Sequence, residues 1–260
     1  MALVDEKHGD LDYNKFATIG RWLHAGVVWV TSGAVEIGRL DYIHRNGKEL
    51  EGNGEDIKTD YAAQGQSVLM ETYRRFTDPK ISLRQVLVEH SHFNNDGARA
   101  HILRLLERAA QQNAVPVVNY NDAVSFEELR KMEITSLRGE GKKAVELIDN
   151  DETAAQIACL TGAKKLLILS NLDGVYRDIN DKSSLITEIT GTRGEVINKI
   201  DEYKANCSGA SRKGANGASA KLEYIKPCIM QGIDVIIASA RYDISDILSG
   251  LSPATRITTK

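Results

Sequence analysis

Cysteine is scarce in this chain, and its spacing argues against two classes of site. The 260 residues contain three cysteines, Cys159, Cys207 and Cys228, which are far apart and form no Cys-x-x-Cys pair. Structural zinc sites and disulfide frameworks depend on numerous or closely spaced cysteines. We therefore expect neither of them, and this cysteine usage is typical of a reducing cytoplasm.

Long hydrophobic runs and a surplus of one charge are also missing. The longest apolar runs are far shorter than the about 20 residues of a membrane span, and the start, MALVDEKHGDLDYNK, is too charged for a signal peptide. A formal net charge of −3 offers no electrostatic attraction to nucleic acid or to an anionic membrane. We expect a cytoplasmic protein with neither kind of partner.

Short apolar runs alternate with amphipathic stretches of helix length along the chain. The runs are VVWVTS, QVLVEH, PVVNY, KLLILS and DVIIAS, at residues 27–32, 85–90, 116–120, 165–170 and 234–239. They are rich in β-branched residues and apolar on both faces, as in a sheet covered by helices on each side. The pattern predicts an α/β fold, a three-layer αβα sandwich with a mainly parallel central sheet.

Three polar segments interrupt this alternation. Residues 44–58 are predicted to form a loop or short hairpin, and 125–147 part of a helix or a hairpin. Residues 207–221, CSGASRKGANGASAK, are rich in Gly, Ser and Ala and carry three cationic side chains. This segment fits either a linker or an anion-binding loop, since Gly214 and Gly217 permit close backbone approach to a phosphate. It is not a Walker A loop, because Gly-x-x-x-x-Gly-Lys-Ser/Thr is absent.

Small and polar residues gather where the predicted strands end. The segments TSGA, NYND and SNLDG, at 31–34, 119–122 and 170–174, follow three of them. Each alone is more often an ordinary turn. Together they predict one polar edge, because ligands of open α/β sheets bind at the carboxyl ends of the strands.

A run of four polar residues, 149–152 (DNDE), opens the helix predicted after it. The ordinary explanation is capping, since Asp and Asn accept hydrogen bonds from free N–H groups at a helix start. We find no Cys/His nucleophile pair, no Ser/His/Asp order and no histidines at metal-ligand spacing, so we predict no protein metal site.

The motifs, in this order, resemble the amino acid kinase family, and within it most closely the members that phosphorylate glutamate. The likeness rests on VVWVTSGAVEIG, DYAAQGQSVLMETYRRF, NAVPVVNYNDAV, DNDETAAQIACLTGAKKLLILSNLDGVY and KGANGASAKLEYIKPCIMQGIDVIIAS. It covers roughly residues 11–255. The resemblance implies one amino-acid-kinase-like domain over 1–260, with an acceptor-binding part at about 1–150 and a nucleotide-binding part at about 151–260. It implies no C-terminal RNA-modification-like domain.

The resemblance also implies an activity. It is transfer of the γ-phosphoryl group of ATP, with Mg²⁺, to the side-chain carboxylate of glutamate, giving an acyl phosphate in the first step of proline biosynthesis. Such a carboxylate is ionised at neutral pH and needs no general base, so catalysis consists of positioning and cationic stabilisation. Family members often form dimers or tetramers, so the resemblance further implies a homo-oligomer.

Site residues follow from the same resemblance. The catalytic residues would be Lys221, which binds the transferring phosphoryl group, and Asp151, which orients that lysine. The acceptor would be bound by Ser32, Gly33, Asp122 and Asn150. The nucleotide would be bound by Ser170, Asn171, Ala215, Asn216, Gly217, Ala218, Ser219, Ala220 and Lys221.

Two alternatives stay open. Another acceptor, such as aspartate, an acetylated amino acid or a small phosphorylated compound, fits the same motifs. Family members also begin with an apolar strand ending in Lys-x-Gly-x-Ser/Thr, whose lysine contacts the phosphates, and this chain starts at Met1 where that motif would have just ended. We therefore expect one of two kinds of protein. One is an active kinase that has a further strand upstream in the natural protein or uses another cation, and the other is a nucleotide- or amino-acid-binding protein that does not turn over.

Overall fold

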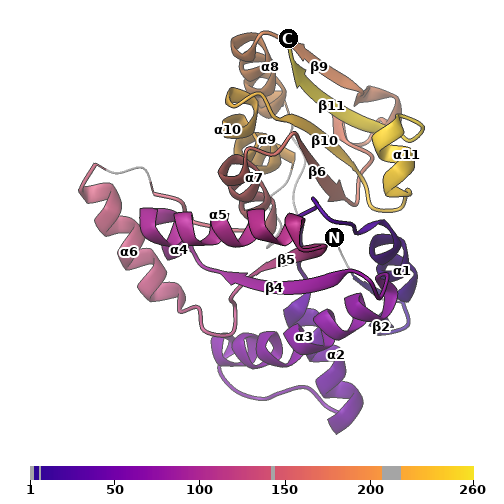
Figure 1. Cartoon of the computed structure of the whole chain (residues 1–260), viewed down its shortest axis with the longest axis vertical. Helices are drawn as coiled ribbons and strands as arrows, with labels where there is room; N and C mark the ends of the chain where they lie inside the picture. Colours follow the sequence, from indigo (N-terminus) through magenta and orange to yellow (C-terminus); the bar gives the residue numbers. More distant parts are fainter. Residues whose placement is uncertain (1–2, 6, 142–143, 207–217) are drawn as a thin grey trace. The chain divides into compact units, whose positions relative to one another are not determined.

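The computed structural model describes residues 3–5, 7–141, 144–206 and 218–260 and consists of two compact units (Figure 1). These are Ala2–Asn150 and Asp151–Lys260. Each unit contains a sheet with helices on both of its faces (Figure 1). This confirms the predicted α/β fold class. Within the described ranges, no helix combines the length and the apolar character needed to cross a membrane.

The first unit is built on a three-stranded parallel sheet in the order β3-β5-β4. α5 covers one face of this sheet, and α2 and α3 lie on the other (Figure 1). The strands of this unit are β1 (Val4–Asp5), β2 (Asp10–Leu11), β3 (Trp29–Val30), β4 (Ser82–Val88) and β5 (Ala114–Tyr120). Its helices are α1 (Tyr13–Trp22), α2 (Ala34–Asn46), α3 (Gly54–Phe76), α4 (His90–Asn94), α5 (Asp96–Gln111) and α6 (Glu127–Gly139).

Helices α2 and α3 touch backbone to backbone through two glycines. A Cβ atom on Gly65 would lie 1.8 Å from the carbonyl oxygen of Ala34, and one on Gly38 would lie 1.8 Å from the carbonyl oxygen of Tyr61. Neither position therefore accommodates a larger residue without a shift of the backbone. This contact gives the Gly of the AAQGQ segment a packing role and sets where the residues around it lie.

The second unit contains a four-stranded sheet in the order β6-β10-β11-β9. β6 and β10 are parallel, β11 and β9 are parallel, and the two pairs join antiparallel between β10 and β11. The strands of this unit are β6 (Lys165–Ser170), β7 (Val175–Tyr176), β8 (Leu185–Ile186), β9 (Glu188–Gly191), β10 (Asp234–Ser239) and β11 (Ala254–Thr259). Its helices are α7 (Asn150–Thr161), η1 (Lys182–Ser184), α8 (Arg193–Asn206), α9 (Ala218–Tyr224), α10 (Lys226–Met230) and α11 (Ile244–Ser249).

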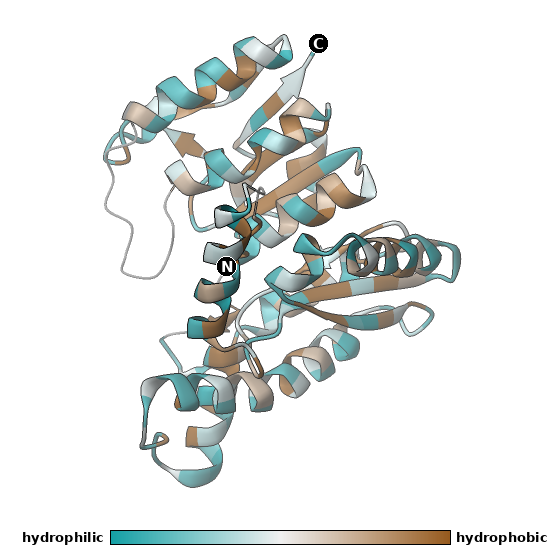
Figure 2. Cartoon of the chain, turned by 90° about the vertical axis from the view of Figure 1, so that its left-hand side faces the viewer, coloured by the Kyte–Doolittle hydropathy of each residue, from teal (hydrophilic) through white to brown (hydrophobic). Residues whose placement is uncertain are grey.

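The middle of strand β10 is apolar because both of its faces are buried. Val235 and Ile237 pack into a core shared with α8, α9 and α10, whereas Ile236 and Ala238 pack with Ile247 of α11 on the opposite face. All four strand residues are at most 5% exposed. Hydrophobic residues accordingly fill the strands, while the helices carry hydrophilic residues on their outer sides (Figure 2).

The predicted strands are all present, and one loop prediction is wrong. Residues 44–58 are not a single loop or hairpin, because α2 continues to Asn46 and α3 already begins at Gly54. Gly47 ends α2 with φ 71°, and the Asn53 side chain accepts the N–H of Glu55 at the start of α3. Gly and Asn serve turns and helix caps alike, so a cluster of them does not distinguish the two.

Candidate functional site

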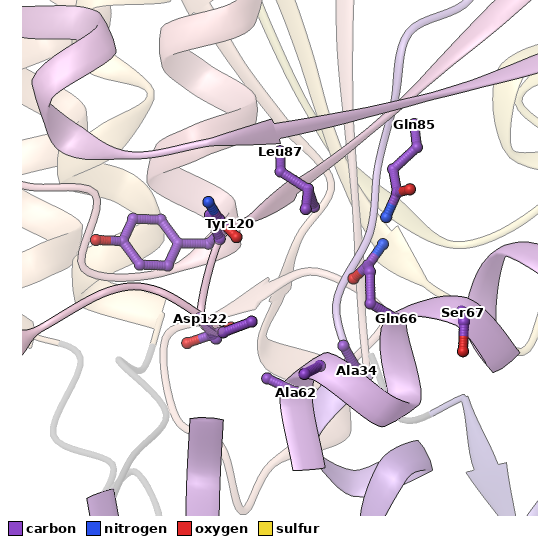
Figure 3. Close-up of a pocket in the computed structure, with 11 residues that line it drawn as sticks. Ala34, Ala62, Gln66, Ser67, Gln85, Leu87, Tyr120 and Asp122 are labelled. Atoms are coloured by element: carbon purple, nitrogen blue, oxygen red, sulfur yellow. The ribbon is translucent and has the colours of Figure 1, made fainter. Parts of the chain in front are cut away.

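A cavity of about 280 Å³ lies beside the carboxyl end of β5 in the first unit (Figure 3). Small side chains and uncharged polar groups form most of its wall. The lining residues are Ala34, Ala62, Ala63, Gln66, Ser67, Gln85, Leu87, Tyr120, Asn121, Asp122 and Ala123. Its size suits a small molecule with few heavy atoms.

The end of β5 is held by amide side chains. Asn119, 2% exposed, donates from Nδ2 to Oε1 of Gln66 at 2.9 Å, and its Oδ1 accepts the N–H of Tyr120 at 2.9 Å. Asn121 donates to Oε1 of Glu89 at 2.9 Å. These bonds connect β5 to α3 and to the end of β4. They fix the strand end from which the next residue, Asp122, projects.

Among the described residues that line this cavity, Asp122 is the only one with a carboxylate. Its Oδ1 lies 2.9 Å from Nζ of Lys58, a residue of α3. The Asp122 side chain is 23% exposed and that of Lys58 is 59% exposed. A mostly covered carboxylate therefore faces the cavity with a solvent-exposed lysine as its partner.

Gln66 contributes an unsatisfied donor to the same wall. Its residue is 8% exposed, and its Nε2 has no hydrogen-bond partner among the described residues. In Figure 3 the amide groups of Gln66 and Gln85 point toward one another. A buried donor without a partner lowers the stability of the folded protein. A ligand oxygen would remove this cost by accepting from Nε2, and so would the Gln85 side-chain oxygen if that amide were rotated by about 180°.

Ser32 and Gly33 form the turn between β3 and α2. Gly33 has φ 99°, a left-handed conformation that favours glycine, and it stands directly before Ala34 in the cavity wall. The preceding strand is anchored by Tyr73, whose hydroxyl lies 2.9 Å from both Nε1 of Trp29 and Oγ1 of Thr31. Burial raises the pKa of Tyr73 to about 12, against the opposing effect of these two hydrogen bonds.

Asn150 begins α7 and is not in the lining of this cavity. Its Oδ1 is buried and has no hydrogen-bond partner in the described part of the chain. Of the four residues predicted to bind the acceptor, only Asp122 is in the cavity wall. Ser32 and Gly33 are outside the lining but directly precede Ala34, which is part of it. Gln66, Gln85 and Lys58 were not foreseen, although Gln66 belongs to a motif that the sequence singles out.

In the second unit, the two residues predicted to be catalytic are ion-paired. Nζ of Lys221, on α9, contacts Oδ2 of Asp151, the second residue of α7. Each side chain is 22% exposed. The pair joins positions 70 residues apart in the sequence. The partly covered carboxylate holds the lysine side chain in one orientation.

The residues after β6 and β10 form a polar edge. Ser170 and Ser239 are register partners at the ends of these two parallel strands. The Ser170 hydroxyl accepts the N–H of Leu172 at 3.1 Å, and Asn171 is exposed. Small polar residues do follow the strand here, but the prediction of one shared polar edge is wrong. β6 belongs to the four-stranded sheet of the second unit, whereas β3 and β5 belong to the three-stranded sheet of the first, and local sequence does not report which strands share a sheet.

Arg241 places a cation at this edge, and this residue was not predicted from the sequence. Its guanidinium lies 2.7 Å from Oδ2 of Asp173 and 4.7 Å from the ring centroid of Tyr242. The only signal in the sequence is a lone arginine two residues after a predicted strand, which is common on ordinary surfaces.

The remaining nucleotide-binding candidates divide into two groups. Ala218, Ser219 and Ala220 form the half-buried start of α9, ahead of Lys221. Ala215, Asn216 and Gly217 lie outside the described residues. In the described ranges, no group of three or more His, Cys, Asp or Glu side chains is placed to hold a metal ion.

The comparisons with known proteins agree with one another. Residues 3–239 match the model of the amino acid kinase family. The glutamate 5-kinase of Clostridium perfringens is 29% identical over 245 residues, covering 90% of this chain and 81% of that protein. Glutamate 5-kinase 1 of Bacillus licheniformis is 31% identical over 242 residues, covering 89% of this chain and 58% of that protein.

A likeness in structure accompanies the likeness in sequence. The carbamate kinase from Giardia lamblia, solved with AMP-PNP, superimposes with a TM-score of 0.59 and 17% identity over 99% of this chain and 95% of that one. At this identity the likeness shows the fold alone.

Proposed function

Since this chain belongs to the amino acid kinase family, we propose that it transfers the γ-phosphoryl group of ATP to the side-chain carboxylate of glutamate. Membership makes the chain a kinase, and the glutamate carboxylate as acceptor is the proposed part. Support comes from similar curated relatives that are named glutamate 5-kinases. The product would be an acyl phosphate, the first intermediate of proline synthesis.

The first unit would bind the acceptor. The Asp122 carboxylate would take the ammonium group of the amino acid, and the unsatisfied Nε2 of Gln66 would donate to one of its oxygens. The turn at Ser32 and Gly33 has small side chains, so its backbone N–H groups are accessible to an anion. Placing the acceptor in this way lowers the entropic cost of the transfer.

The second unit would bind ATP. The Lys221 ammonium would contact the transferring phosphoryl group, whose developing charge must be neutralised. Asp151 would act as a positioning residue that holds Lys221. Ser170, Asn171 and the residues before Lys221 would contact the nucleotide.

Magnesium fits this proposal without a site made of protein ligands alone. Mg²⁺ keeps several water ligands and is held mainly by substrate phosphates with one or two carboxylates. Mg²⁺ would therefore enter together with the nucleotide. When bound, it would neutralise phosphate charge.

The observation that carries the proposal is the Lys221–Asp151 ion pair in a chain of this family. The test measures ADP release with magnesium–ATP across a panel of carboxylate acceptors, with hydroxylamine present to trap an acyl phosphate as a hydroxamate. Glutamate should give both products. If ADP is released with aspartate or an acetylated amino acid and not with glutamate, that compound is the acceptor. Nucleotide binding without ADP release would indicate a binding protein.

A further inference from the structure

Asp122 has a cation beside it within its own unit. Nζ of Lys58 lies 2.9 Å from its Oδ1, and the lysine side chain is 59% exposed. An ion pair with so exposed a lysine contributes little to stability, because water and salt compensate for its loss. A ligand ammonium can therefore replace Lys58 at Asp122 at little cost.

The surroundings of Lys58 are acidic. This lysine lies on α3, near acidic groups that include Glu127, whose pKa is lowered mainly by its hydrogen bond with Lys131 and also by the charge of Lys58. The Glu55 carboxylate, on the first turn of α3, is engaged by the backbone N–H of Glu127. These groups keep a positive charge favourable at this edge of the cavity.

An α-amino acid carries an ammonium and a carboxylate on one carbon atom, and Asp122 and Lys58 present the two complementary charges. If the ligand head group enters between them, one internal ion pair is exchanged for two ion pairs with the ligand. The nearby Gln66 Nε2, a donor in a residue only 8% exposed, is a separate indication that the cavity is built for a ligand with oxygen atoms.

We propose that Lys58 and Asp122 together recognise the head group of an α-amino acid, with Asp122 binding the ammonium and Lys58 binding the α-carboxylate. This inference rests on the proposed function insofar as an amino acid is the acceptor. It adds Lys58 as a residue that determines specificity, beyond the residues that would bind the acceptor in the proposed function. It predicts that acceptors without an α-carboxylate charge bind more weakly, because they lose the ion pair with Lys58.

The test is calorimetric binding of L-glutamate and of its α-amide to the whole chain, without ATP. The α-amide keeps the ammonium and the side-chain carboxylate and lacks only the α-carboxylate charge. The unaltered chain should prefer glutamate by about tenfold, as expected when a charged group loses its partner. Lys58→Met should remove this preference by weakening glutamate and leaving the α-amide unchanged, and Lys58→Arg should restore much of it.

Lys48→Met is the matched control. Lys48 lies between α2 and α3, is 69% exposed, and is paired with Glu51 rather than with a cavity residue. This variant should keep the preference for glutamate. Circular dichroism and the thermal midpoint of each variant show whether it is folded, and Lys58→Gln provides a second uncharged variant.

The outcomes separate the two proposals. If glutamate binds but Lys58→Met and Lys58→Gln keep the preference over the α-amide, the role of Lys58 is overturned and the acceptor proposal stands. The same holds if Lys58→Met binds glutamate more tightly, since Lys58 is then only a competitor for Asp122. If neither glutamate nor any other amino acid binds the unaltered chain, the acceptor proposal itself fails.

Discussion

The ammonium group of Lys221 is ion-paired with the carboxylate of Asp151, which joins α9 to the start of α7. The two side chains are equally covered, at 22% exposure. The ion pair fixes the direction of the lysine side chain. In a kinase, such preorganisation lets the cation act on the transition state with little rearrangement.

Replacing this lysine tests its role in the transfer. Lys221→Ala should lower kcat by ~10²–10³, the loss expected for one preorganised group that faces developing charge. The circular dichroism spectrum should not change. Lys164→Ala, at an exposed lysine of the same unit, serves as the control. Turnover close to normal in a folded Lys221→Ala protein would exclude the assignment.

Asp122 is expected to act on the acceptor and not on the nucleotide. Asp122→Ala should raise the KM for the amino acid by at least about tenfold, because the substrate ammonium loses its partner. The KM for ATP should change little. Steady-state titration of each substrate measures both constants. A change confined to the KM for ATP would contradict the placement of Asp122 in the acceptor cavity.

The contact between α2 and α3 predicts a large effect from a small substitution. Gly65→Ala should lower the free energy of unfolding by about 3 kcal/mol or more, because its Cβ would lie 1.8 Å from the Ala34 carbonyl oxygen. Gly54→Ala, in the same helix but with open space around it, should leave stability unchanged or raise it by up to about 1 kcal/mol. Urea unfolding of both variants measures the difference. Equal stabilities would mean that the two helices adjust easily.

Tyr73 predicts a loss of stability at alkaline pH. Burial raises the pKa of Tyr73 from 10.0 in the unfolded chain to about 12 in the folded one. Between these values the unfolded chain releases a proton that the folded chain retains, so stability is complete below pH 10 and falls as the pH rises toward 12. The loss amounts to about 3 kcal/mol.

The measurement compares the unaltered chain with Tyr73→Phe, which lacks the ionisable group. Tyr73→Phe should be less stable at neutral pH, since Trp29 and Thr31 lose a hydrogen-bond partner. Its free energy of unfolding should nevertheless fall less steeply between pH 10 and 12. Parallel curves for the two proteins would assign the alkaline loss to other groups.

Cys159 and Cys228 should form a disulfide on oxidation. Their Sγ atoms are 3.4 Å apart, although 69 residues separate them in the sequence. The hydrogen bond with Cys228 lowers the pKa of the Cys159 thiol, and Cys159 is also the more exposed of the two. The Cys159 thiolate should therefore attack oxidised glutathione, which forms a mixed disulfide and releases one reduced glutathione. Cys228 should then attack the Cys159 sulfur of this mixed disulfide, which forms the protein disulfide and releases the second reduced glutathione.

The check is made in a Cys207→Ser background, so that only these two thiols react. Thiol titration and mass spectrometry should show the loss of two thiols and of two hydrogen atoms. Adding Cys159→Ser should prevent it. Persistence of both thiols, or of a stable mixed disulfide with glutathione, would mean that the buried Cys228 cannot reach its neighbour.

Part of this protein could be predicted from local sequence. Runs such as DVIIAS have consecutive apolar residues, most of them β-branched, and a strand buried on both faces needs that composition, so β10 was predicted correctly. The α/β class follows from the same reasoning, because each such strand requires helices on both sides. The segment around Asn53 was misjudged, since a helix cap and a turn use the same residues.

The residue types and their order along the chain were enough to identify the family and to suggest Lys221, Asp151 and Asp122. Only the tertiary structure paired Lys58 with Asp122 and brought Cys159 to Cys228. It alone also showed that Nε2 of Gln66, in the cavity wall, has no hydrogen-bond partner within the described part of the chain. Local patterns report the burial and the backbone conformation of each segment. Which side chains from distant segments meet depends on how helices and strands pack, and for α2 and α3 that packing is set by the close approach of two glycines.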